Sequence, residues 1–478
     1  MEIHAAALTK GEPERLHQQA LELLEHHGIR LLSEAARQRF ADHGARVENE
    51  RVRIPVPLSE EALKTVKKSF LVGARNPERS VQVGESFPPV YGPAGGMVKV
   101  SDAEKGRRPA CMADLQNFLK LAHTSPHVQI SAAGMVYPTD IPPHAAFYLQ
   151  MLQAIELSDK PLFALTRDAR VAEDTIGMAR IATGAKYDHF AFGVVNCLSP
   201  MAWDGNTLES IRVFAENDQP CIIASCSMAG FTSPIRLRET VLQNHAEILT
   251  GIIWSQMVRP GAPVIYGNTS SIADMRTMGL AIGAPEYVLV STAAVQLARL
   301  VGVPCRTGGG LTDAKVLDAQ AGIESAQAGI ESALNLLFTE INHVDMVLQG
   351  IGVMESFATI SYEKWMMDEE IRERILRLVK GLNAPDADAA EIIGEKGPGE
   401  NFMMVPSTLS CFRSEHYYPP LSDRSGWDKW KRTGISFEER ATAAWKRRLE
   451  SYHQPEIEAP IRRALHRLLK NRGIETPI

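Results

Sequence analysis

Apolar residues along the chain gather in short runs that alternate with longer segments of helical periodicity. From about residue 88 onward each run is apolar almost throughout, and Gly, Pro, Asp or Ser residues separate it from the next helical segment. Strands that are apolar on both faces are typical of a parallel sheet with helices on each side. The pattern predicts eight strands, at residues 88–96, 127–138, 161–167, 189–199, 220–230, 263–271, 304–310 and 343–352. It predicts helices between and after them, at about 112–124, 142–158, 171–184, 205–217, 234–259, 285–301, 313–339 and 362–382.

Eight strands that are each followed by a helix predict an α/β fold of the (β/α)8 TIM-barrel type, over residues 88–382. The alternative is an open, doubly wound sheet. Such a sheet usually has a Gly-rich GxGxxG turn after its first strand, whereas the segment PAGGMVKV opens no helix. Three of the strands begin at a proline, a position where proline is tolerated. We therefore favour the barrel.

Two further segments flank the predicted barrel. Residues 1–87 predict an N-terminal helical extension that ends in a short hairpin near residues 70–84. Residues 383–478 predict a C-terminal segment that packs on the barrel, with a Pro/Gly-rich connector, an aromatic stretch and a charged helical tail. The heptad echo AGIESAQ–AGIESAL at 321–334 predicts one helix face packed against the barrel wall.

Composition narrows the classes of protein. The chain has 478 residues and a formal net charge of −6, without a basic block, which argues against a nucleic-acid or anionic-membrane partner. No apolar run approaches the roughly 20 residues that cross a bilayer, and no secretory signal is visible. The six cysteines are scattered singly, as is typical of reduced, buried thiols. We expect a cytoplasmic protein.

In a barrel, the reacting groups come from the carboxyl ends of the strands. The side chains at these ends are mostly aromatic, amide and hydroxyl groups, which suit a permanently charged substrate such as a quaternary ammonium ion, because aromatic faces attract cations. Tyr266 and Asn268 share strand parity, so we expect both to face the interior. The predicted substrate-binding residues are Tyr91, Tyr137, Asn196, Tyr266, Asn268, Arg306 and Gln349.

Several catalytic signatures are missing from the sequence. There is no HExxH, no GxSxG and no Walker A motif, and no set of His and carboxylate residues recurs at the strand ends. We therefore expect no protein-bound metal and can name no catalytic residue. Each strand-end tyrosine has a simpler interpretation as a ring that caps the core. Cys226 is most simply a packed thiol, since no histidine accompanies it.

Three stretches resemble the trimethylamine methyltransferase superfamily. They are YGNTSSIADMRTMGLAIGAPEY, RTGGGLTDAKVLDAQAGIES and HYYPPLSDRSGWDKW, and the similarity runs over nearly the whole chain. The founding members carry pyrrolysine, but this chain contains only standard residues and so resembles the non-pyrrolysine branch. That branch includes enzymes that demethylate glycine betaine, proline betaine and carnitine. Lys315 is our candidate for the position that pyrrolysine would take.

The resemblance implies a (β/α)8 barrel that moves a methyl group from a quaternary amine to cob(I)alamin, the cobalamin (corrinoid) being carried by a separate corrinoid protein. It also makes a homo-oligomer an expectation. Arg306, two residues before the glycine run, is the first candidate to bind a betaine carboxylate, with Arg167, Asn268 or the glycine amides as alternatives; Arg306 could instead pair with Asp313. The residues expected to face the corrinoid are Gly308, Gly309, Gly310, Asp313 and Lys315.

Other functions remain open on the sequence alone. The same scaffold could demethylate a sulfonium compound or another methylamine, or could bind betaines without catalysis. An unrelated barrel lyase or hydrolase is a further possibility. The aromatic stretch His416–Tyr418 with Trp427 and Trp430 could form a lid or an oligomer contact, or simply a small core beneath the C-terminal tail.

Overall fold

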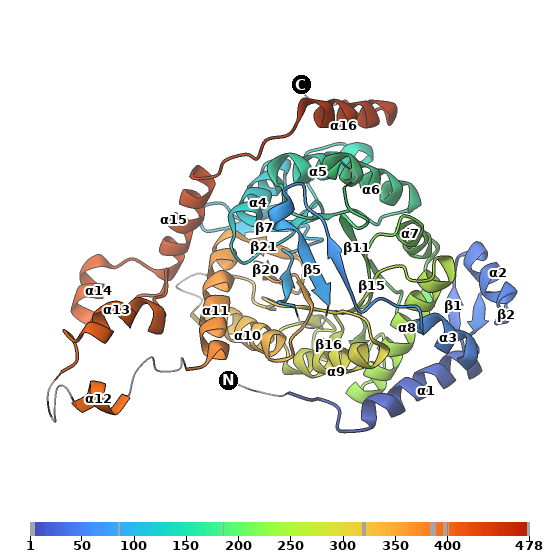
Figure 1. The fold of residues 1–478 in the computed structure, drawn as a ribbon, viewed down its shortest axis with the longest axis horizontal. Helices are drawn as coiled ribbons and strands as arrows, with labels where there is room; N and C mark the ends of the chain where they lie inside the picture. The colour runs from blue at the N-terminus through green and yellow to red at the C-terminus, as the bar shows by residue number, and fades with distance from the viewer. Residues whose placement is uncertain are drawn as a thin grey trace.

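The computed structural model contains one sheet of eight parallel strands, with helices around it (Figure 1). It describes residues 5–84, 87–184, 186–317, 322–382, 389–394, 399 and 401–475. All eight strands lie within the runs predicted from the sequence. They are β6 (Val90–Tyr91), β9 (Ser131–Ala132), β10 (Leu162–Phe163), β11 (Ala191–Asn196), β13 (Cys221–Ser225), β15 (Val264–Asn268), β18 (Cys305–Gly308) and β19 (Met346–Leu348).

The strand order follows the chain. The sheet runs β6-β19-β18-β15-β13-β11-β10-β9, so the first strand pairs with the last. A doubly wound sheet would instead reverse its order at a switch point, which excludes that alternative. Near the two strands at the ends of this order, the backbone N–H of Gln129, two residues before β9, donates to the Tyr91 carbonyl of β6 at 2.8 Å.

Helices follow the strands as the periodicity predicts. They are α4 (Met112–Thr124), α5 (Pro143–Leu157), α6 (Ala169–Thr183), α7 (Gly205–Glu216), α8 (Leu237–Val258), α9 (Pro285–Val301), α10 (Gly322–Ile341) and α11 (Tyr362–Lys380). The predicted helix start at residue 313 is wrong. Residues 311–317 are not helical, because the Asp313 carboxylate accepts hydrogen bonds from the backbone N–H groups of Ile282 and Gly283, each at 3.0 Å. Residues 318–321 of that predicted helix, where the heptad echo begins, lie outside the described residues.

The first residues form three helices and two small sheets. The helices are α1 (Glu12–His26), α2 (Glu34–Asp42) and α3 (Val56–Leu63). The predicted hairpin is confirmed by β4 (Ser69–Val72) and β5 (Val81–Gly84), which pair antiparallel around a 3-10 turn at Pro77–Arg79. Sequence periodicity missed β1 (Ile29–Leu31), β2 (Arg46–Glu48) and β3 (Arg51–Arg53), because three residues are too few to show a period. Strand β1 pairs with β12 (Ala202–Trp203) and so joins this segment to the eight-stranded part.

Two small sheets follow the carboxyl ends of the parallel strands. One consists of β14 (Met228–Ala229), β16 (Ser271–Ala273) and β17 (Leu280–Ala281). The other consists of β7 (Lys99–Asp102), β8 (Gly106–Pro109), β20 (Val353–Met354) and β21 (Thr359–Ser361). The second sheet frames the loop between β20 and β21, which becomes important below.

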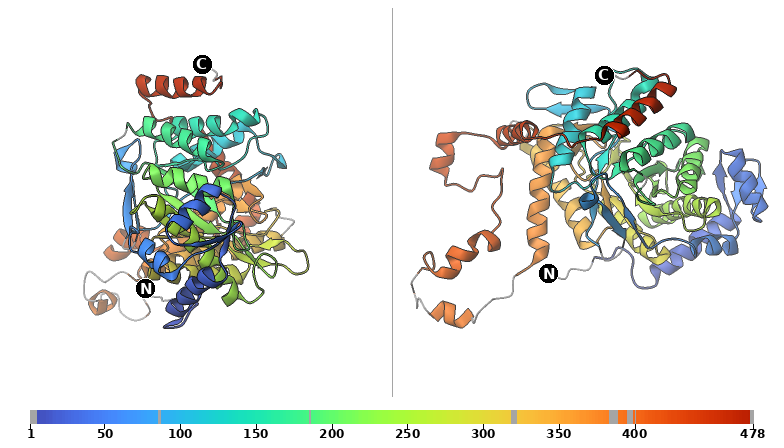
Figure 2. Two further views of the ribbon diagram at one scale, coloured as in Figure 1. Left: turned by 90° about the vertical axis from the view of Figure 1, so that its right-hand side faces the viewer. Right: turned by 45° about the horizontal axis from the view of Figure 1, so that its top comes forward.

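The C-terminal segment divides into an arm and a packed tail. Helices α12 (Ala389–Gly394), α13 (Pro406–Glu415) and α14 (Trp427–Thr433) stand away from the eight strands (Figures 1 and 2). Neither α13 nor α14 has a buried residue, and the Trp427 side chain is 68% exposed, so Trp427 and Trp430 do not form a small core. Tyr417 is half-buried instead, and its hydroxyl donates to the Glu373 carboxylate of α11 at 3.1 Å. None of these aromatic residues lines the pocket described below. Helix α15 (Phe437–Glu450) packs on α11, and α16 (Ala459–Asn471) packs on α6. None of the described helices is long and apolar enough to cross a membrane.

Candidate functional site

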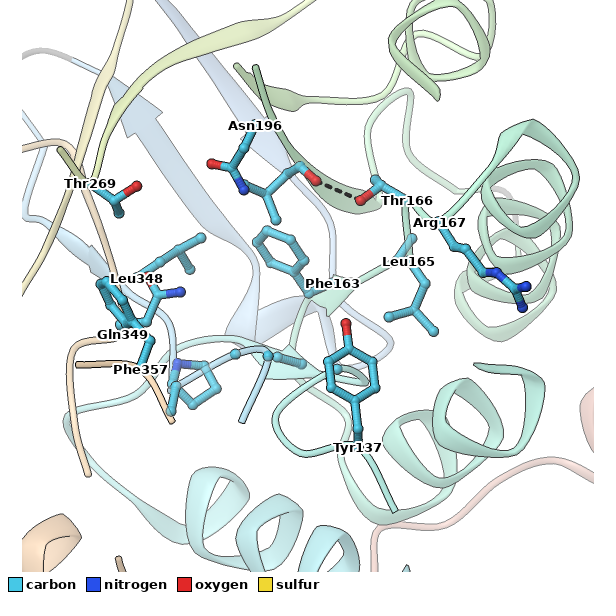
Figure 3. A pocket seen from close by; sticks show the side chains of 18 of the residues that line it. Tyr137, Phe163, Leu165, Thr166, Arg167, Asn196, Thr269, Leu348, Gln349 and Phe357 are labelled. Carbon is cyan, nitrogen blue, oxygen red and sulfur yellow. Dashed lines mark hydrogen bonds between the residues drawn. The ribbon is translucent and has the colours of Figure 1, made fainter. Parts of the chain in front are cut away.

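A cavity of about 500 Å³ lies at the carboxyl ends of the eight parallel strands (Figure 3). Every one of these strands, or the loop directly after it, contributes to its wall. In chain order, one residue from each strand end is Pro93, Gly134, Thr166, Asn196, Cys226, Thr269, Arg306 and Gln349. The site therefore lies where parallel strands with crossover helices bring their loops together.

Strand parity decides which side chains reach the cavity. On β15, Tyr266 donates or accepts a hydrogen bond with His245 of α8 at 2.9 Å, and the Asn268 amide donates to Ser291 of α9 at 3.1 Å. Both side chains therefore turn toward the helices, and the predicted interior orientation of this pair is wrong. Thr269, one residue later, lines the cavity instead. A shift of one residue exchanges the two faces of a strand.

Arg306 of β18 is buried in the cavity wall, and no acidic side chain among the described residues pairs with it. Its guanidinium donates to the Gln349 side-chain oxygen and to the Asn268 carbonyl, the latter at 3.5 Å, while its Nε–H has no partner among the described residues. Burial lowers the pKa of Arg306 from its ordinary value of 12.5 to about 10, so the group still carries its charge near neutral pH. Asp313 binds Ser356 at 2.5 Å and two backbone N–H groups, so the alternative pairing of Arg306 with Asp313 is not formed.

Two amide side chains also line the cavity. Gln349 follows β19 and has a positive φ of 50°, which turns its side chain back across the sheet to Arg306. Asn196 ends β11 and is exposed to the cavity (Figure 3). Both were predicted from the sequence as substrate-binding residues, and the structure brings both into the same wall.

Aromatic rings form much of the remaining wall. Tyr137, Phe163 and Phe357 surround the space in Figure 3. Phe147 also lines the cavity and packs edge-on against Tyr137 at a ring-centroid distance of 6.2 Å. The Arg167 guanidinium lies 5.2 Å from the centroid of the Phe147 ring and uses that face. Tyr137, Phe163 and Phe357 are therefore the rings left to contact a ligand.

The charge of the wall is uneven. Arg167 and Arg306 are its charged residues, and it contains no Asp, Glu, Lys or His side chain among the described residues. Cys226 lines the wall as well, and burial raises the pKa of its thiol, so it is a neutral group at physiological pH. The Arg167 guanidinium lies 3.7 Å from the Asp168 carboxylate and points away from the space in Figure 3, which leaves Arg306 as the cation that faces a ligand. A ligand that carries only positive charge would be repelled by Arg306, whereas a zwitterion would find a partner there for its anionic end.

Tyr91 does not reach the cavity, although it was predicted to bind substrate. It is fully buried, its hydroxyl donates to Glu340 at 2.7 Å, and the Arg372 guanidinium lies 3.7 Å from its ring centroid. Its ring face is therefore already occupied by a cation of the protein. Burial also raises the pKa of this phenol, which stays protonated.

The glycine run packs against neighbouring backbone. A side chain at Gly310 would come within 2.6 Å of the Gly350 carbonyl oxygen, and one at Gly309 within 2.8 Å of Val347. The Gly310 N–H donates to that Gly350 carbonyl at 2.9 Å. These positions therefore require glycine for close contact between the ends of β18 and β19. Of the residues predicted to face a corrinoid, Gly308, Gly309 and Gly310 are buried. Asp313 is half-buried and Lys315 is exposed.

Sequence reasoning missed four aromatic or hydroxyl residues of the wall, namely Phe147, Phe163, Thr269 and Phe357. Phe163 and Thr269 belong to runs that were identified, but their orientation depends on parity that the sequence did not fix. Phe357 lies outside all eight strand runs, in the loop between β20 and β21. The sequence gives no signal for it, because its position depends on a backbone conformation described below.

The match to a family model covers residues 3–477 and describes the trimethylamine methyltransferase family. The chain belongs to the trimethylamine methyltransferase (MTTB) family. It is 36% identical to a glycine betaine methyltransferase of Desulfitobacterium hafniense strain Y51, over 98% of this chain and 97% of that protein. It is 31% identical to a proline betaine:corrinoid methyltransferase of Eubacterium limosum, over 95% of each chain.

A solved structure also has a similar fold. The Methanosarcina barkeri monomethylamine methyltransferase MtmB matches with a TM-score of 0.53 and 11% sequence identity, over 79% of this chain and 76% of that one. At this identity the likeness concerns the fold.

Proposed function

We propose that this member of the MTTB family transfers a methyl group from a quaternary amine that carries a carboxylate, of the glycine betaine type, to the corrinoid of a separate corrinoid protein. Family membership supports the reaction class, and the named activities of the two relatives support a betaine as substrate and a corrinoid as acceptor. The observation that carries the substrate class is Arg306, a buried guanidinium that pairs with no acidic side chain in the described part of the chain, in a wall that also holds aromatic rings.

The two halves of a betaine fit the two kinds of wall. A substrate carboxylate would supply the anion that Arg306 lacks, through charge-assisted hydrogen bonds. The trimethylammonium group would lie against Tyr137, Phe163 and Phe357, whose faces attract a cation. A methylamine without a carboxylate would place its charge in the same cavity as Arg306 and would have no anionic group to pair with that arginine.

The proposed methyl transfer requires little proton transfer by the protein. A corrinoid, when bound, supplies a cobalt nucleophile that accepts the methyl group. The nitrogen leaves as a neutral tertiary amine and needs no general acid, in agreement with a wall that has no Asp, Glu, Lys or His side chain among the described residues. The positive charge on nitrogen fades toward the transition state, so a strong anion beside it would favour the ground state. Neutral rings and the amides of Asn196 and Gln349 orient the substrate without that penalty.

Four further features of the protein, namely barrel closure, domain organisation, cellular location and oligomeric state, belong to the same proposal. We propose that the eight strands close into a (β/α)8 barrel, supported by the pairing of β6 with β19 and by the Gln129–Tyr91 hydrogen bond. We propose that residues 1–87 form an N-terminal extension, residues 88–382 the barrel and residues 383–478 a C-terminal segment. A cytoplasmic location is supported by six cysteines that are all free thiols. A homo-oligomer is supported by exposed apolar side chains on the arm and on α9 and α10, such as Leu289 and Ile330.

The test uses reduced cobalamin and a panel of methyl donors. We expect methylcobalamin, followed by its visible absorbance, with glycine betaine or another carboxylate-bearing quaternary amine, and little with choline, trimethylamine or a sulfonium without a carboxylate. Dimethylsulfoniopropionate, a sulfonium with a carboxylate, tests the alternative substrate class. Tight betaine binding without any methyl transfer, even with a cognate corrinoid protein present, would instead identify a betaine-binding protein.

A further inference from the structure

The loop between β20 and β21 contains three consecutive residues in the left-handed region of backbone space. Glu355, Ser356 and Phe357 have φ angles of 50°, 49° and 75°, and none of them is glycine. Single left-handed residues occur in turns, but successive ones are rare, and a bulky residue there is a genuine outlier. Such strain persists only where surrounding contacts impose it, and it concentrates at functional sites.

Contacts with the segment after β18 hold this turn in place. The Glu355 N–H donates to the Ala314 carbonyl at 3.1 Å, and the Ser356 N–H donates to the Thr312 carbonyl at 3.3 Å. The Ser356 hydroxyl donates to the Asp313 carboxylate at 2.5 Å. The turn is therefore fastened by both backbone and side-chain hydrogen bonds.

The other side of the turn is fastened by an ion pair. The Arg107 guanidinium of β8 donates to the Glu355 carboxylate at 2.7 Å, and the Thr359 hydroxyl donates to the same carboxylate. Asp313 is itself fixed by two backbone N–H donors from the loop before α9. Two independent segments thus oppose relaxation of the strained backbone.

The strained conformation places the Phe357 ring in the cavity wall. Phe357 is half-buried and lines the cavity on the side of Gln349, across from Tyr137 (Figure 3). Within the described ranges, no cation of the protein lies over its face, unlike Phe147 and Tyr91, which are covered by Arg167 and Arg372.

We propose that Phe357, held by the left-handed turn of residues 355–357, is a specificity-determining residue whose ring contacts the quaternary nitrogen of the substrate. The inference rests on the proposed function and deepens it, because it assigns recognition of the positive charge to a residue outside the eight strands. Asp313 and Ser356 then act as positioning residues, since they reach the substrate only through the turn.

The experiment compares two ligands that differ only in charge. Glycine betaine and 3,3-dimethylbutanoate have the same shape, but the second has carbon in place of the quaternary nitrogen. Isothermal titration of the full chain without a corrinoid protein measures binding of each. We expect Phe357→Leu to weaken glycine betaine binding by about fivefold to thirtyfold, because an aromatic face contributes about 1 to 2 kcal/mol to a cation. Binding of 3,3-dimethylbutanoate should be unchanged.

Two further variants keep the result interpretable. Phe357→Tyr retains the aromatic face and should retain betaine affinity, which separates loss of the ring from a folding defect. Phe231→Leu makes the same replacement in an exposed loop outside the cavity wall, and should leave both affinities as in the wild type.

Other outcomes overturn the inference. An equal loss of affinity for both ligands in Phe357→Leu would show that the ring only packs, and no loss for either would show that it does not contact the ligand. If the wild-type protein binds neither ligand, the proposed function fails and the inference falls with it. If the wild type binds betaine but Phe357→Leu shows no selective loss, the inference alone fails.

Discussion

Replacing Arg306 by methionine should have opposite effects on ligand binding and on stability. The guanidinium is buried, and the described residues give it carbonyl and amide oxygens but no carboxylate. Without substrate, the protein therefore carries the desolvation cost of a charge that no anion offsets. The Arg306→Met side chain keeps a similar length and removes that charge.

The magnitudes follow from burial. The lowering of the Arg306 pKa from 12.5 to about 10 corresponds to about 3 kcal/mol of unfavourable free energy for the charged form in the folded protein. Because the folded pKa lies below the ordinary value, this penalty is present at every pH below about 10 and fades between about 10 and 12.5. We expect Arg306→Met to raise the free energy of unfolding by about 1 to 3 kcal/mol at neutral pH, as replacement of buried charges by apolar groups often does.

Binding should change in the other direction. Truncating one partner of a buried, hydrogen-bonded charge pair costs about 2 to 5 kcal/mol, so glycine betaine affinity should fall by at least about thirtyfold. Choline has the same cation without the carboxylate, and its weaker binding should be unaffected or improved by the substitution. The preference of the wild type for betaine over choline should therefore disappear in Arg306→Met.

Titration calorimetry and urea unfolding of the same preparations measure the two effects. Arg306→Lys keeps a charge without the planar fork and should recover only part of the betaine affinity. Undiminished betaine binding by Arg306→Met would refute the assignment of the carboxylate site. A large loss of stability in the unliganded variant would refute the view that the charge is uncompensated.

Three other predictions concern residues around the cavity and in the core. In urea unfolding, the free energy of unfolding of Ser356→Gly should be about 1 kcal/mol higher than that of Ser356→Ala, because both variants lose the hydroxyl but glycine adopts a positive φ without strain. Equal free energies of unfolding would show that the turn is not strained. Burial beside Arg79 lowers the pKa of His123 to about 4, so below its ordinary value of 6.5 the unfolded chain binds a proton that the folded chain does not. Stability should thus be complete above pH 6.5 and fall toward pH 4, and His123→Asn should flatten this fall in acid-unfolding curves; an unchanged curve would contradict burial of a neutral imidazole. Tyr91→Phe should lower the free energy of unfolding by about 1 to 2 kcal/mol, because it loses the hydrogen bond to Glu340, and should leave betaine affinity intact. Tyr137→Ala should instead lower betaine affinity. A binding defect in Tyr91→Phe would mean that the cavity extends further than described.

The sequence by itself determined the order of strands and helices. Runs that are apolar on both faces and separated by helical segments are a local property of the chain, and all eight predicted strands are confirmed. Arg306, Asn196, Gln349 and Tyr137 were also recognisable as candidates, because each is a polar side chain within an otherwise apolar run that predicts a barrel strand.

Tertiary structure alone decided which side chains face the cavity. Tyr266 and Asn268 turn toward helices because a strand's two faces differ by one residue, and the register that selects the face is set by pairing with neighbouring strands. That none of the described acidic side chains pairs with Arg306 cannot be seen in the sequence either, because Asp313 lies only seven residues away but is held by the backbone of another loop. Phe357 reaches the cavity through three left-handed residues that contacts from distant segments impose. Local preference opposes that conformation, so only the assembled fold can select it.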